Sequence, residues 1–474
     1  MADDSPETLT LETLDVAIAS LRNSLKIMSR EDPDFYSQTT LLAHGLRKHY
    51  LILRPHGDLS DLDESITLFQ QALESSPTDD AKRAECLVSL AFCLSLRCDE
   101  TGSEIDAIEA SRSAADAANT LGKDDPSYIT ILQSACYFIR KTAIRLHDEN
   151  DMESVFNMHK HILSVTDIDH PQLKSRFRDY DNDLFNGYLA FGDVEYLQAA
   201  IQVSEDIINI PDQSSEEHAR NIWILGRRLV QRYLRTGTSA DLDDGIRACQ
   251  QAVDYTPLNS KDRQRRLQSL CDSLGEKYSQ TQEEADYQAV KVVLDQILDH
   301  LPTKQKSRAR SLGNIGVILS LRYRQTGHDD DFQRAIRVAK EAVDLTANGD
   351  MGHAVRLSNL GTVYAEAYCN TGNTERLEEA IRIGREALTA TPNGHPDKAM
   401  RHFNLADRLQ LRYSESGSTD DLKEAISLYR LTLHEFKAPM FLRVEAGYSL
   451  MQACVWNRDL NEAYEAGAET IDHL

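Results

Sequence analysis

The sequence predicts an all-α fold, an α-α superhelix (a solenoid) of about ten helix pairs with a 45-residue period. A glycine recurs at spacings of 45 or 90 residues, at Gly57, Gly102, Gly192, Gly237, Gly327, Gly372 and Gly417. A tyrosine recurs every 45 residues, at Tyr188, Tyr233, Tyr278, Tyr323, Tyr368 and Tyr413. The alternation of period 2 that is typical of strands is almost absent. Because independent features keep one register, the chain is a tandem repeat.

Each repeat predicts two helices. Between residues 353 and 372 the apolar and small residues mostly follow the 3, 4, 7 spacing of a helix face, and Gly372 suits the left-handed cap that ends such a helix. A second apolar face runs from Leu377 to Leu388, and Pro392 marks its end. Prolines in one phase of the repeat indicate the starts of first helices, at Pro126, Pro171 and Pro396.

In chain order, the sequence predicts a disordered N-terminus at 1–9 and a single solenoid over 10–474. A leading helix covers 11–29. First-type helices are expected at 35–54, 80–99, 127–146, 171–190, 215–235, 261–279, 304–325, 351–370, 395–415 and 440–455, with second-type helices between them. His147 and Gln282 stand where the recurring glycine is missing, and units 127–212 and 260–302 depart most from the pattern. The last unit is shortened and uncapped, with Leu460 and Ala463 standing where Leu422 and Ala425 stand in the preceding unit, 38 rather than 45 residues later.

The repeat resembles the tetratricopeptide family. Leu360, Gly361 and Tyr364 match the pattern of that family's first helix, and Ala380 and Ala387 match the second. The second helix falls seven residues later than in the 34-residue family repeat, which is about two helical turns, so the buried face stays in phase. The recurring tyrosines of these longer helices are expected to form an additional layer of the core.

The unit from Glu379 to Ile426 is similar to the long tetratricopeptide repeats of large fungal proteins. In that family such an array commonly precedes a caspase-like CHAT protease domain or belongs to an immune-receptor-like protein. The resemblance therefore implies two functions. The first is a protein-binding scaffold or sensor, and the alternative is the N-terminal regulatory part of a larger effector. The absence of a polar final helix favours a fragment or a final helix covered by a partner.

Composition narrows the function classes. The chain has 52 Lys and Arg against 76 Asp and Glu, a formal net charge of −24, which argues against nucleic acid and anionic membranes as partners. Eight cysteines without a CxxC pair are expected to be small core residues of a cytoplasmic protein. Acidic stretches such as "GTSADLDD" and "GSTDDL" are expected to cap second-type helices. Phosphate-loop, zinc-protease and nucleophile-elbow motifs are absent, so we expect no enzyme activity, metal or cofactor.

The expected partner is therefore a protein or peptide on the concave face of first-type helices, with the oligomeric state left open. Asn314, Asn359 and Asn404 recur every 45 residues, in the slot that faces the groove and often holds Asn in the peptide-binding tetratricopeptide proteins that the repeat resembles. Arg356 and Arg401 lie three residues before two of these asparagines and complete the candidate partner-binding set. In the alternative, the asparagines cap or brace the neighbouring repeat. The carboxylate clamp of chaperone-binding relatives is not matched.

A second basic row precedes the recurrent tyrosine in most repeats. It comprises Arg97, Arg232, Lys277, Arg322 and Arg412. We expect these side chains to pair with acids of the adjacent repeat, and the alternative is contact with an acidic patch of a partner.

Overall fold

The structure is a computed structural model of the 474-residue chain. It describes residues 11–472 apart from 54–58, 76–78, 212–213, 300–304, 393–394, 396, 436–437 and 439. The expected disordered N-terminus at 1–9, the first recurring glycine and the proline at 396 lie outside the described residues. Among the residues that the structure does describe, no helix is long and apolar enough to cross a membrane.

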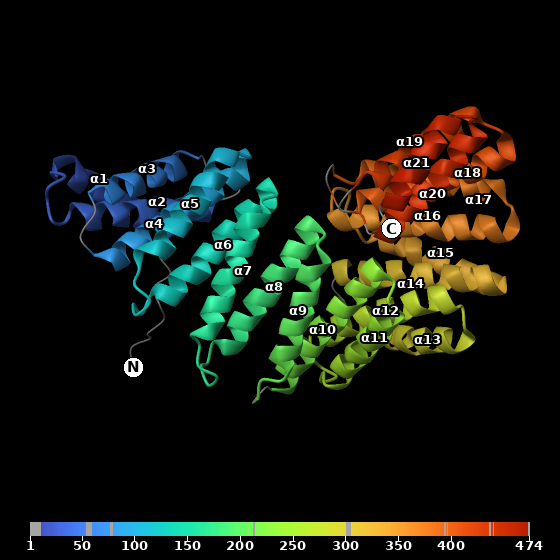
Figure 1. The fold of residues 1–474 in the computed structure, drawn as a ribbon, viewed down its shortest axis with the longest axis horizontal. Coiled ribbons are helices and arrows are strands. Elements are labelled where there is room, and N and C mark those ends of the chain that lie inside the picture. The colour runs from blue at the N-terminus through green and yellow to red at the C-terminus, as the bar shows by residue number, and fades with distance from the viewer. Residues whose placement is uncertain are drawn as a thin grey trace. The chain divides into compact units, whose positions relative to one another are not determined.

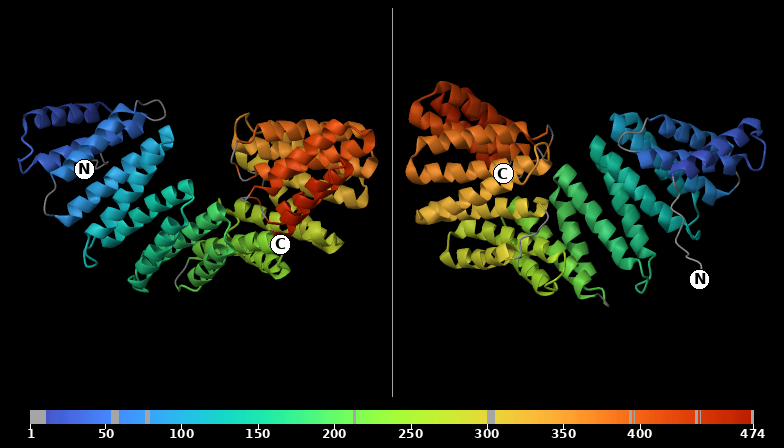
Figure 2. Two further views of the ribbon diagram at one scale, coloured as in Figure 1. Left: turned by 45° about the horizontal axis from the view of Figure 1, so that its top comes forward. Right: turned by 180° about the vertical axis from the view of Figure 1, so that it is seen from behind.

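The described residues form 21 α-helices, arranged as consecutive hairpins (Figures 1 and 2). Unit 1, residues 1–191, holds α1 (Leu11–Ile27), α2 (Phe35–Leu53), α3 (Ser60–Glu74), α4 (Asp80–Thr101), α5 (Glu104–Thr120), α6 (Tyr128–Leu146), α7 (Glu149–Ser164) and α8 (Leu173–Phe191). Unit 2, residues 192–474, holds α9 (Val194–Ile208), α10 (Ser215–Thr236), α11 (Ser239–Asp254), α12 (Arg263–Thr281), α13 (Glu284–Asp299), α14 (Gln305–Thr326), α15 (Asp329–Asp344), α16 (Met351–Thr371), α17 (Thr374–Thr389), α18 (Lys398–Ser416), α19 (Thr419–Leu433), α20 (Met440–Trp456) and α21 (Leu460–Asp472).

These helices confirm the predicted all-α fold and its period. The leading helix is α1, and the even-numbered helices are the predicted first-type helices, each starting within three residues of its expected position. The odd-numbered helices from α3 onward are the second-type helices. The fold is tetratricopeptide-like, and a single continuous solenoid over both units stays a prediction.

Wherever the structure describes it, the recurring glycine ends its first-type helix in the left-handed conformation. Its φ angle is 74° at Gly237 and 64° at Gly372. The two positions where the glycine is missing adopt the same conformation, with φ at 55° for His147 and 52° for Gln282. A residue with a Cβ atom is disfavoured there, so the turn is imposed by the hairpin around it.

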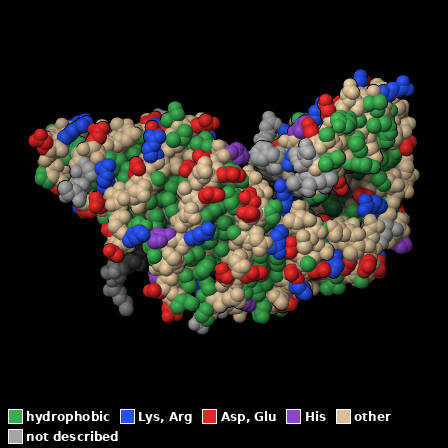
Figure 3. All heavy atoms as spheres, in the orientation of Figure 1, with side chains coloured by type: hydrophobic (Ala, Val, Ile, Leu, Met, Phe, Trp, Pro, Cys, Tyr) green, Lys and Arg blue, Asp and Glu red, His purple; other side chains and the backbone are tan. Residues whose placement is uncertain are grey.

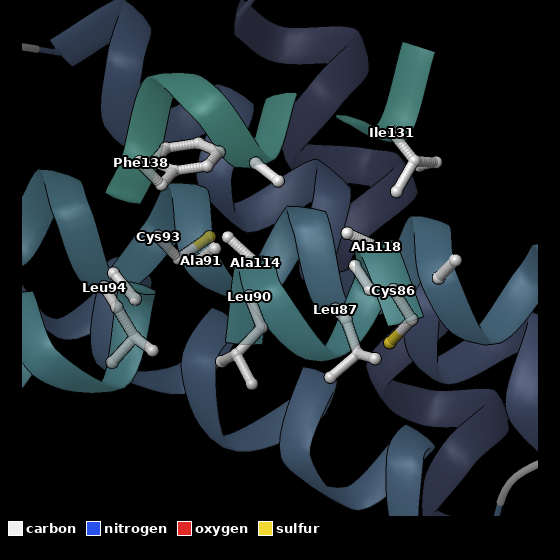
Figure 4. Close-up of a cluster of buried hydrophobic side chains, with 14 of the residues drawn as sticks. Cys86, Leu87, Leu90, Ala91, Cys93, Leu94, Ala114, Ala118, Ile131 and Phe138 are labelled. Atoms are coloured by element: carbon white, nitrogen blue, oxygen red, sulfur yellow. The ribbon is translucent and has the colours of Figure 1, made fainter. Parts of the chain in front are cut away.

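Small and apolar side chains fill the space between hairpins, as Figure 4 shows for unit 1, where Leu90, Cys93 and Phe138 belong to one cluster. The predicted tyrosine layer is confirmed for Tyr323 and Tyr368, which are buried. Seven of the eight cysteines are buried, whereas Cys369 is exposed, contrary to expectation. In the last hairpin Ala463 packs in the core as Ala425 does in the preceding one, whereas Leu460 is exposed, unlike Leu422.

The irregular repeat sequence at 127–212 places a group of buried polar side chains within unit 1. The carboxylate of Asp183 on α8 lies 2.9 Å from Arg140 Nη1 of α6 and 2.9 Å from His159 Nε2 of α7. Burying charged side chains is costly unless they are paired, so three consecutive helices are tied together at this point. The departure from the repeat pattern thus has a structural role in packing.

The acidic stretches have two roles at the starts of second-type helices, and the sequence predicted only one of them. Ser418 does cap α19, because its side chain accepts a hydrogen bond from the backbone N–H of Asp421. Thr238 and His328, at the same position before α11 and α15, make no side-chain cap. The carboxylate three residues after the cap instead pairs with an arginine of the preceding first-type helix. Side-chain caps do precede α5, α7, α9 and α17, and acidic residues stand in the first turns of α11, α15 and α19. The cap prediction is therefore confirmed in part, and the pairing with arginine is an additional role of these acids.

Curvature places the first-type helices on the inside of each unit. Successive first-type helices of a unit contact one another, whereas among the described residues successive second-type helices make no comparable contact. In unit 2, α10 also contacts α20, with Arg235 Nη1 3.5 Å from the carbonyl oxygen of Ala438. The inner faces of the helices from α10 to α20 therefore surround a hollow, and Figure 3 shows the surface hollowed in this unit.

Candidate functional site

The inner surface of unit 2 is formed by side chains three or four residues apart on each first-type helix. Contacts between successive helices identify them. Asn314 on α14 donates to the carboxylate of Asp272 on α12 at 2.7 Å, and Arg324 Nη1 on α14 lies 3.3 Å from a carboxylate oxygen of Glu366 on α16. Both pairs are separated by 42 residues, which is one period less one helical turn. The predicted asparagine ladder lies on this surface.

The three asparagines differ in their contacts. Asn314 braces the neighbouring hairpin through Asp272, as the alternative interpretation expects. Asn359 and Asn404 are half-buried, and within the described part of the chain their amides make no hydrogen bond. An amide offers two donor hydrogens and an acceptor oxygen, so these two side chains are available to a ligand.

Arg356 and Arg401 are buried, with 7% and 5% of their surface exposed. They occupy a repeated position whose other arginines bond to a threonine ten residues earlier, as Arg176 does to Thr166 at 2.5 Å and Arg266 does to Thr256. Burial lowers the pKa of both Arg356 and Arg401. The two predicted side chains therefore lie mainly between hairpins, beneath the asparagines rather than beside them.

Sequence reasoning missed an arginine cluster, which we define as Arg227, Arg265 and Arg310, on α10, α12 and α14. All three side chains are exposed. Arg227 and Arg265 lie over the ring of Trp223, 5.0 Å and 4.7 Å from its centroid, and the indole Nε1 donates to Ser269 at 2.8 Å. Burial, and then the neighbouring arginines, lower the pKa of Arg227. Among the described residues, the cluster forms no ion pair.

A signal for this cluster exists in the sequence. Two of its members, Arg265 and Arg310, belong with Arg220 to a third basic row spaced by 45 residues, whereas Arg227 lies outside that row. The spacing alone could not distinguish it from the row before the tyrosines. The structure does so, because only one of the two rows is paired with acids.

One carboxylate, that of Asp272, faces the arginine cluster. It is exposed to solvent, yet desolvation raises its pKa, while hydrogen bonds from Gln268 and Asn314 act in the opposite direction. The carboxylate of Asp272 joins α12 to α14 through the hydrogen bond from the Asn314 amide at 2.7 Å.

The inner surface is acidic on the helices farther along the chain. Desolvation raises the pKa of Glu366 on α16 and of Glu445 on α20, and it raises that of Asp407 on α18 to about 6. The Tyr429 hydroxyl donates to Asp407 at 2.6 Å. The surface thus carries opposite charge on α10–α14 and on α16–α20.

The second basic row is paired. Arg97, Lys277 and Arg412 each bind an acid of the previous hairpin, which confirms the prediction for them. Arg232 and Arg322 bind an acid of their own hairpin and a neutral side chain of the previous one. Arg412 binds Asp421 of its own hairpin at 2.6 Å and 2.9 Å and Glu378 of the previous hairpin at 2.7 Å. Arg97 does the same with Asp106 and Asp63. These side chains hold successive hairpins together. Among the described residues, no group of three or more His, Cys, Asp or Glu side chains could hold a metal ion.

No protein-family model and no curated protein matches the chain. Solved structures align over most of it at low identity. The human IFIT1 dimer with m7Gppp-AAAA is 15% identical, covers 100% of this chain and 96% of its own, and has a TM-score of 0.41. The STAND protein with a tetratricopeptide repeat sensor from Pyrococcus horikoshii is 12% identical over 99% of this chain and 66% of its own, with a TM-score of 0.40. The apo quorum sensor NprR from B. thuringiensis is 12% identical over 98% and 99%, with a TM-score of 0.35.

Proposed function

We propose that the chain is a non-catalytic binding module that takes a protein or peptide on the inner surface of unit 2. The observation that carries this proposal is the pair Asn359 and Asn404, half-buried amides in register on α16 and α18 that make no hydrogen bond within the described residues. A polar group removed from water is stabilised when it acquires a partner. The backbone of an extended peptide offers a donor and an acceptor at every residue.

The spacing of the two amides suits an extended chain. Neighbouring packed helices lie about 8–10 Å apart. An extended peptide advances about 3.3 Å per residue, so it passes from one amide to the next in about three residues. A ligand that runs across the first-type helices can therefore meet both asparagines without bending.

The test is the double variant Asn359→Ala and Asn404→Ala, compared with Gln333→Ala on the exposed side of α15. Each protein, immobilised at equal density, is exposed to extract of the cells that express it, and retained proteins are quantified by mass spectrometry. We expect the double variant to lose at least one partner that the control retains. Equal retention by all three proteins, with unchanged circular dichroism, would contradict the proposed surface.

A further inference from the structure

We propose that the arginine cluster (Arg227, Arg265 and Arg310) binds an acidic segment of the partner protein through its carboxylates. This inference rests on the proposed function and adds the chemistry of the ligand to it. It assigns a ligand to the part of the inner surface formed by α10, α12 and α14. Of the three asparagines predicted from the sequence, only Asn314 lies there.

Acids of the described residues balance the positive charge of the arginine cluster poorly. Where arginines of this chain lie near acids they pair with them, and Arg97 and Arg412 each bind two carboxylates. Among the described residues, the carboxylate of Asp272 acts on Arg227 and Arg310, and its Oδ1 already accepts hydrogen bonds from Gln268 at 2.9 Å and Asn314 at 2.7 Å. Three exposed guanidinium groups are thus left uncompensated in a chain with a net charge of −24. Like charges held close together favour the binding of opposite charge.

Beside the cluster lies a buried N–H donor that has no hydrogen-bond partner among the described residues. Arg356 on α16 is 7% exposed, and its buried Nε makes no hydrogen bond in the described part of the chain. The side chain lies against α14, where a Cβ atom added at Gly313 would stand 2.9 Å from Arg356 Cδ. The charge of Arg310 acts on the Arg356 guanidinium and, after burial, contributes to lowering its pKa. A carboxylate bound at Arg310 would reduce this repulsion.

Two guanidinium groups of the cluster are held in orientation by an aromatic ring. Arg227 and Arg265 lie over the indole of Trp223, which restricts the orientation of their guanidinium planes. A guanidinium with restricted orientation loses little freedom when it binds a carboxylate through two parallel hydrogen bonds. The three helices α10, α12 and α14 span about 20 Å at a spacing of about 10 Å, the length of about six extended residues.

Nucleic acid fits this surface less well. Proteins that bind single strands use exposed aromatic rings on which bases stack. Trp223 is only 8% exposed, and arginines already lie over its ring. A long polyanion would also approach Asp407 and Glu445 on the following helices, which repel it. A short acidic segment avoids this repulsion because the arginine cluster occupies only α10–α14.

The experiment measures binding of a fluorescein-labelled peptide of about ten alternating Glu and Ala residues to the full chain by fluorescence anisotropy, at about 50 and 200 mM salt. The same peptide with Gln in place of Glu and a labelled oligoadenylate are the comparison probes. The test variant carries Arg227→Gln, Arg265→Gln and Arg310→Gln. The control removes equal charge at exposed arginines of second-type helices, by Arg247→Gln, Arg334→Gln and Arg337→Gln.

We expect the Glu peptide to bind the native chain, and the test variant to weaken its affinity about tenfold or more while the control changes it less than about twofold. The Gln peptide should not bind. Absence of Glu-peptide binding, an equal loss in both variants, or equal binding of oligoadenylate at the arginine cluster would overturn the inference. If the Glu peptide fails while Asn359→Ala with Asn404→Ala still abolishes partner retention, the inference is wrong and the proposed function stands.

Discussion

The carboxyl group of Asp407 on α18 makes the stability of the folded chain depend on pH. Desolvation by burial raises its pKa from the ordinary 3.8 to about 6, and the nearby Glu445 adds to the shift. Between these two values the folded chain binds a proton that the unfolded chain releases. Stability therefore falls as pH rises from about 4 to about 6, and it stays lower above that range.

Replacement of Asp407 by Asn removes this titration. A shift from 3.8 to about 6 corresponds to about 3 kcal/mol at about 1.36 kcal/mol per pH unit, and partial solvent access reduces it to about 1–3 kcal/mol. The Tyr429 hydroxyl, which donates to Asp407 at 2.6 Å, can donate to the amide oxygen of Asn as well. We expect Asp407→Asn to be more stable than the native chain at pH 7.5 and nearly equal to it at pH 4.

The assay is urea unfolding, followed by circular dichroism and tyrosine fluorescence, at pH values from 4 to 8. The quantity compared is the difference in unfolding free energy between variant and native chain at each pH, because other titrating groups cancel in that difference. A difference that does not change with pH, or a variant less stable at pH 7.5, would refute the reasoning that desolvation dominates at Asp407.

Two further predictions concern the repeat. Gln282 has a φ of 52°, which disfavours a residue with a Cβ atom, so Gln282→Gly should raise the unfolding free energy by about 0.5–1 kcal/mol. Gly372 has a φ of 64°, so Gly372→Ala should lower the unfolding free energy by about 1 kcal/mol for the same reason. Urea unfolding measures both changes, and the opposite signs would contradict this explanation of the turn. In a double-mutant cycle of Arg412→Ala and Asp421→Ala, whose side chains are 23% and 9% exposed, we expect a coupling of about 1 kcal/mol. Additive effects would show that the bidentate pair does not tie the hairpin together.

The helices and their turns could be predicted from the sequence because one pattern was repeated many times. The left-handed turn at Gln282 follows from the register even though its residue type disfavours it. The pairing of Arg412 follows from the same register, since an acid stands nine residues later and another lies in the previous hairpin. The association with a caspase-like domain is a property of the resembling fungal arrays and stays a prediction.

The site could be predicted only in part, because burial depends on how successive hairpins pack. Asn359 and Arg356 are three residues apart on one helix, and spacing alone assigns both to the groove. In the structure both side chains approach Gly313 of the neighbouring helix α14, but Asn359 is half-buried whereas Arg356 is buried. The arginine cluster depends on the packing of successive hairpins in unit 2, which brings Arg265 of α12 over the Trp223 ring of α10 and Arg310 of α14 close enough to act on the charge of Arg227.

The central claim is that partners bind to the inner surface of unit 2. A photo-crosslinking amino acid placed at Val317 on α14, beside the asparagine ladder, or at Gln333 on the exposed side of α15 tests it in cells that express the protein. If partners bind there, irradiation yields covalent partner adducts from position 317 and none from position 333. Adducts from position 333 with none from 317 would place the binding surface on the second-type helices and contradict the account.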